Sequence, residues 1–166
     1  MTRIALVPGC LALRARYASL ADPVADLRAA CRTATCWLGR EVAVLAGPQG
    51  RAIAAELLAS RAAASGAATS CLVVANGSAR RTEQAPGHLD TRAPGFDDEL
   101  RRALTAPDPA ALRAVDLALG ARLWADVAHV PALGTLLAGA ATVSVDYDDD
   151  PYGVQYWVLR WETPPG

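Results

Sequence analysis

The pattern of apolar and polar residues predicts alternating strands and helices in the first half of the chain. Short apolar runs at 3–7, 41–46 and 71–75 are rich in β-branched residues, as is typical of strands buried on both faces. Apolar residues at helical spacing predict helices over 22–33 and 51–64. This strand–helix–strand–helix–strand order favours a mostly parallel sheet with right-handed crossovers, and hence an α/β protein.

The second half of the chain predicts more helix and then a pair of strands. One helix is expected over 96–104, and a second from Asp108 to Leu119 with a break or bend at Gly120. A short helix follows, and residues 141–145 and 154–161 then alternate as strands do. The acidic segment 146–153 between these strands predicts a turn and an antiparallel pair at one end of the sheet. The whole chain, 1–166, is expected to form one domain.

The strand at 71–75 leads into a long polar loop, which is the first place to expect a site. Ligands of α/β proteins bind beyond the carboxyl ends of the strands. The candidate pocket there is lined by Asn76, Ser78, Arg80, His88 and Asp90, with Asp146 of the acidic segment at its rim. Asn76–Ser78 is equally compatible with an ordinary strand-ending turn, and the arginines of the loop with pairing to Glu83 and Asp90.

Composition narrows the classes of function. The net charge of −1 argues against a nucleic-acid partner, because little would drive counterion release. All 16 basic residues are arginine, which excludes lysine Schiff-base chemistry. The four cysteines include no CxxC pair, so we expect free thiols in a reducing compartment. No signal peptide or membrane-spanning segment is evident, so we expect a cytoplasmic protein without a membrane partner.

Two longer motifs carry a family resemblance. NGSARRTEQAPGHLD at 76–90, followed by Phe96-Asp97, and YDDDPYGVQY at 147–156 resemble an uncharacterised actinobacterial group of LigB-like proteins, within the class III extradiol ring-cleavage dioxygenase superfamily. The group is related to the LigB ring-cleavage enzymes and, more distantly, to Memo-type proteins. The resemblance covers residues 70–161 well and the first 65 weakly. It implies a three-layer α/β/α sandwich around a mixed sheet.

The family's active members hold a non-haem Fe(II) with two histidines and one carboxylate. One of these histidines follows the first strand, where this chain has Pro8-Gly9-Cys10. A catalytic histidine follows a later strand, where this chain has Gly77-Ser78-Ala79. We therefore expect a protein that has lost the iron site and has no cofactor. It would be a non-catalytic small-molecule binder or interaction scaffold, self-associating as a homo-oligomer.

The alternative is an enzyme with a rearranged site. A metal-dependent oxygenase or hydrolase would hold Fe(II) or zinc through His88 and carboxylates such as Asp90 or Asp146, since His129 is the one other histidine. Carboxylates at 146 and 148–150 are also the donor type that hard cations prefer, although their spacing does not match an EF-hand loop.

Overall fold

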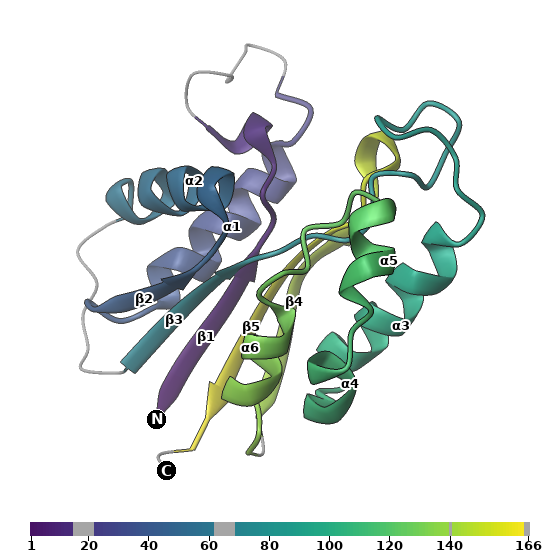
Figure 1. The fold of residues 1–166 in the computed structure, drawn as a ribbon. Helices are drawn as coiled ribbons and strands as arrows, with labels where there is room; N and C mark the ends of the chain where they lie inside the picture. Colours follow the sequence, from purple (N-terminus) through teal and green to yellow (C-terminus); the bar gives the residue numbers. More distant parts are fainter. Residues whose placement is uncertain (15–21, 62–68, 140, 165–166) are drawn as a thin grey trace.

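The computed structural model describes residues 1–14, 22–61, 69–139 and 141–164, and its centre is a five-stranded sheet (Figure 1). The strand order is β2-β3-β1-β5-β4. The strands are β1 (Thr2–Val7), β2 (Val42–Leu45), β3 (Thr69–Val74), β4 (Thr142–Asp149) and β5 (Tyr156–Thr163). Strands β1, β2 and β3 are parallel, and β5 runs antiparallel to both β1 and β4. The mixed, mostly parallel sheet is thus confirmed, with β1 in the middle and β3 beside it.

Helices cover both faces of this sheet, as Figure 1 shows. One face carries α1 (Ala25–Trp37) and α2 (Pro48–Ala59), and the other carries α3 (Ala93–Thr105), α4 (Pro109–Arg113), α5 (Leu117–Arg122) and α6 (Val130–Leu136). Successive side chains of β1 enter the two cores alternately. Ile4 packs with α3–α6 and Ala5 packs with α1 and α2. The α/β/α sandwich follows from this alternation.

Capping residues explain where two of the helices differ from the prediction. Helix α2 begins at Pro48 rather than at residue 51, because proline suits the first helical position. The expected break at Gly120 is wrong, since Gly120 lies inside α5. The break comes earlier, where Asp116 begins α5 by accepting a hydrogen bond from Leu119 N at 2.8 Å. The predicted end of the second helix, at residue 64, lies outside the described residues.

The acidic segment forms less of a turn than expected. Strand β4 continues through Asp149, because Tyr147, Asp148 and Asp149 all pair with β5 after a bulge next to Val145. The turn is therefore confined to Asp150 and the short helix η3 (Pro151–Gly153). The antiparallel pair at one end of the sheet is confirmed.

Two further features agree with the sequence. All four cysteines are free. Cys71 is buried in β3, where a thiol behaves as a small apolar group. In the described part of the chain, no helix has the length and apolar character needed to cross a membrane.

Candidate functional site

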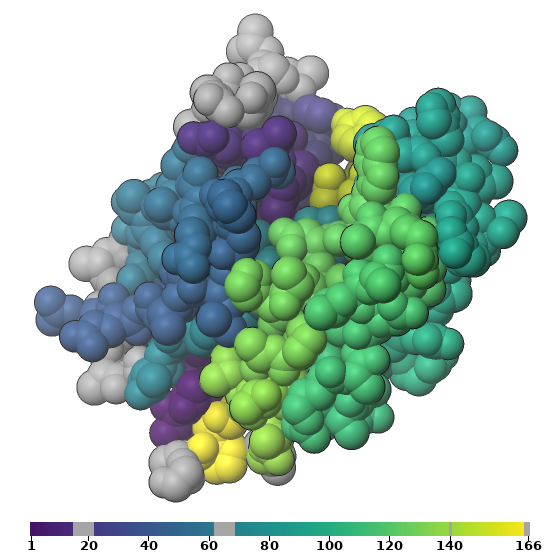
Figure 2. All heavy atoms as spheres, viewed as in Figure 1, coloured from purple at the N-terminus to yellow at the C-terminus, as the bar shows by residue number. Residues whose placement is uncertain are grey.

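The backbone beyond β3 is fixed from both sides. Asn76 forms an isolated antiparallel bridge with Asp126, with N–O distances of 3.0 and 3.1 Å. On the other side, Gly77 N donates to Gln155 O at 2.9 Å, and Gln155 N donates to Ser78 O at 3.0 Å. Residues 76–78 therefore run between two neighbouring segments and continue the sheet past the end of β3. Figure 2 shows the surface recessed on this side, between α2 (blue) and the green segment around residue 125.

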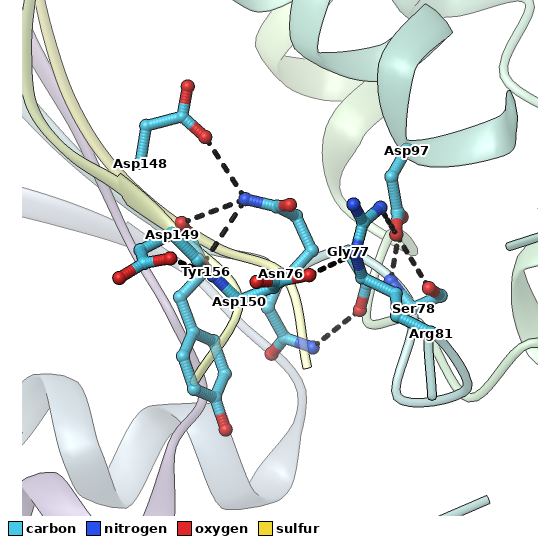
Figure 3. Close-up of polar contacts among 10 residues, drawn as sticks. Asn76, Gly77, Ser78, Arg81, Asp97, Asp148, Asp149, Asp150 and Tyr156 are labelled. Atoms are coloured by element: carbon cyan, nitrogen blue, oxygen red, sulfur yellow. Dashed lines mark hydrogen bonds and ion pairs between the residues drawn. The ribbon is translucent and has the colours of Figure 1, made fainter. Parts of the chain in front are cut away.

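Ser78 belongs to a buried network rather than to an open surface (Figure 3). The Ser78 hydroxyl donates to Asp97 Oδ2 at 2.6 Å, and Ser78 N donates to Asp97 Oδ1 at 2.8 Å. Arg81 donates to Asp97 Oδ2 at 3.0 Å and to Asp150 Oδ2 at 2.7 Å. Burial raises the pKa of Asp97, and these three hydrogen bonds to its carboxylate oppose the rise. Each polar group of this network has a partner, so its role is to hold the loop onto α3.

Arg80, His88 and Asp90 lie together in the loop, but they face one another or the solvent. Arg80 Nη1 donates to the carbonyl of Arg122 at 3.1 Å, and its Nε lies 3.5 Å from the carbonyl of His88. Hydrogen bonds from Arg92 hold the pKa of Asp90 well below its usual range. His88 is exposed, with Nδ1 at 3.4 Å from a backbone carbonyl. These contacts keep the loop closed.

Asp146 lies away from the strand ends. Its carboxylate pairs with Arg160 at 2.6 and 2.8 Å, and Arg160 stands opposite Ala5 in the sheet. The Arg160 guanidinium also lies 5.4 Å from the ring centroid of Trp37, at the end of α1. The structure therefore does not bring Asp146 to Asn76. Asp148 and Asp150 are likewise bound to arginines, Arg101 and Arg81.

Asp126 is the residue that sequence reasoning missed. It is half-buried beside Asn76, and no group in the described part of the chain donates a hydrogen bond to its carboxylate. Burial raises the pKa of Asp126, and the charge of His129 opposes this only in part. No local motif marks Asp126, because it lies between two short helices. Only the backbone bridge to Asn76 places it at the end of the sheet.

Gly9, two residues after the end of β1, completes this group. Its N–H donates to Asn76 Oδ1 at 3.2 Å, and its carbonyl accepts from Gln49 Nε2 at 3.0 Å. A Cβ atom on Gly9 would lie 3.3 Å from Asn76 Oδ1 and 3.4 Å from Asp126 Oδ2. Two side-chain oxygens thus converge on the place where this residue has no side chain. We call Gly9, Asn76 and Asp126 the strand-end site.

Two exposed aromatic residues come from the segments that flank Asn76–Ser78. Trp124 is 58% exposed and Tyr152 is 59% exposed. Both have positive φ, at 57° and 60°, which is uncommon for bulky side chains. The chain therefore keeps large rings on the surface at positions that would suit glycine better.

The residues present do not fit the iron site that the family resemblance implies. His88 contacts its own loop and His129 lies near Asp126. Among the described residues, no three histidine, cysteine, aspartate or glutamate side chains are grouped so as to hold a metal ion. The undescribed residues include none of these four types. We accordingly derive no metal-dependent step.

Comparison with known proteins adds no relative to this picture: no protein-family model matches the chain, and no curated protein matches it significantly.

Proposed function

We propose that this protein is a LigB-like α/β protein that binds a small molecule at the carboxyl ends of β1 and β3 and does not cleave aromatic rings. The observation that carries the proposal is the convergence of Asn76 Oδ1 and Asp126 Oδ2 beside Gly9. Polar groups that converge at the carboxyl ends of α/β strands are the usual form of a ligand site. The recess in Figure 2 gives the ligand access from solvent.

The family part of the proposal rests on the motifs at 76–90 and 147–156. The α/β/α layers agree with the fold that this family would have. The proposal also takes the protein to be cytoplasmic and without a cofactor.

A second candidate function is that of an interaction scaffold. Val145 is 49% exposed on the edge strand β4, whose outer side has no neighbouring strand in the described residues. An unpaired edge with an exposed apolar residue is a place where a second copy can add. Val145→Lys would then shift a dimer to monomer in sedimentation analysis. A wild-type monomer at high concentration would remove this candidate.

The proposed function is tested by measuring metal content and ligand binding on the same preparation. The full chain is purified without chelator or histidine tag, and iron, zinc and manganese are quantified per chain. The ¹⁵N-labelled protein is then titrated with a fragment library and the backbone amides are followed. We expect no stoichiometric metal, even after anaerobic Fe(II) loading, and saturable shifts at Gly9, Asn76 and Asp126.

The opposite results identify the enzyme alternative. Near-stoichiometric metal that is lost in His88→Ala or His129→Ala would overturn the non-catalytic proposal and direct the work to catechol-type substrates with oxygen uptake. Fragments that shift only amides remote from the strand ends would overturn the location of the site.

A further inference from the structure

We draw no further inference here: the strongest candidate, the exposed aromatic surface of Trp124 and Tyr152 on the two segments that flank Asn76–Ser78, carries none, because nothing in the described part of the chain shows what covers it.

Discussion

Two aspartates near the end of β3 show how similar residues can have different roles. Asp97 is buried and accepts three hydrogen bonds, from Ser78 N, Ser78 Oγ and Arg81. Asp126 is half-buried and accepts none from the described residues. Burial raises the pKa of both carboxyls, but only Asp97 has donors that offset it. We infer that Asp97 holds the fold together and that Asp126 is available to a ligand.

The comparison shows that polar residues close together in sequence at the end of a strand need not belong to the same site. Ser78 and Asn76 are two residues apart, yet one is bonded to α3 and the other faces Gly9. The number of donors around each carboxylate distinguishes the structural group from the open one.

The largest effect is expected from removing the structural carboxylate. Asp97→Ala leaves Ser78 and Arg81 without their buried partner and should lower the free energy of unfolding by about 3–5 kcal/mol. Urea denaturation measures this change. Asp98→Ala is the matched control, since Asp98 is the exposed neighbour. A loss below about 1 kcal/mol would contradict the structural role of Asp97.

The second-largest loss of stability is expected when a side chain is added at Gly77, next to the Ser78–Asp97 network. A Cβ on Gly77 would lie 2.6 Å from Asp97 Oδ1 and 2.7 Å from Gln155 Cβ. Gly77→Ala should therefore cost about 1–3 kcal/mol of unfolding free energy. Gly95→Ala, where a Cβ meets nothing within 4 Å, should leave α3 unchanged or more stable. Equal effects of the two alanines in thermal unfolding would refute this account of Gly77.

Replacing Asp126, whose carboxylate accepts no hydrogen bond from the described residues, should not destabilise the fold as replacing Asp97 does. Asp126→Asn is expected to change stability at pH 7 by less than about 1 kcal/mol, or to raise it. The pKa of Asp126 is raised above its ordinary value of 3.8, so wild type loses stability as pH rises from 3.8 through the folded-state pKa. Asparagine does not titrate, so the variant does not lose this stability. Its free energy of unfolding should therefore rise relative to that of wild type as pH increases. Clear destabilisation at neutral pH would show that Asp126 has a partner in the fold.

The smallest effect is expected at the exposed Asp90–Arg92 pair. Arg92 lowers the pKa of Asp90, so its contribution is present at neutral pH and is lost as pH falls through the folded-state pKa. Asp90→Asn should lower stability slightly at pH 7 and not at all in strong acid. This pH dependence has the opposite sign to that of Asp126→Asn. If the stability changes of the two variants depended on pH in the same direction, the roles given to Asp90 and to Asp126 would both be contradicted.

Periodicity in the sequence was sufficient to predict a mostly parallel sheet with alternating helices, because buried strands and amphipathic helices have distinct repeats. The three layers were implied by the family resemblance. The position of Asp146 was harder to predict. Acidic residues followed by Pro151 and Gly153 suggest a turn, but pairing with β5 extends β4 through Asp149. Local pattern does not reveal how far a strand continues when its partner supplies the hydrogen bonds.

The sequence pattern pointed to the end of the buried strand β3. It named one of the three residues of the strand-end site. Asn76 lies where the end of a buried strand predicts a site, at the carboxyl ends of β1 and β3. That Ser78 is bonded to Asp97, 19 residues away, depends on tertiary packing. Asp126 reaches the site through a backbone bridge that leaves no signature in the sequence.

The most direct measurement is the pKa of the Asp97 and Asp126 carboxyls, followed by ¹³C NMR with and without a saturating fragment from the library. We expect the pKa of Asp126 to lie above its ordinary value in the free protein and to change when the fragment binds, because a ligand at the strand-end site alters the surroundings of this carboxyl. The pKa of Asp97 should not change. An unchanged pKa of Asp126, or equal shifts at both aspartates, would contradict the assignment of Asp126 as the ligand-binding carboxylate.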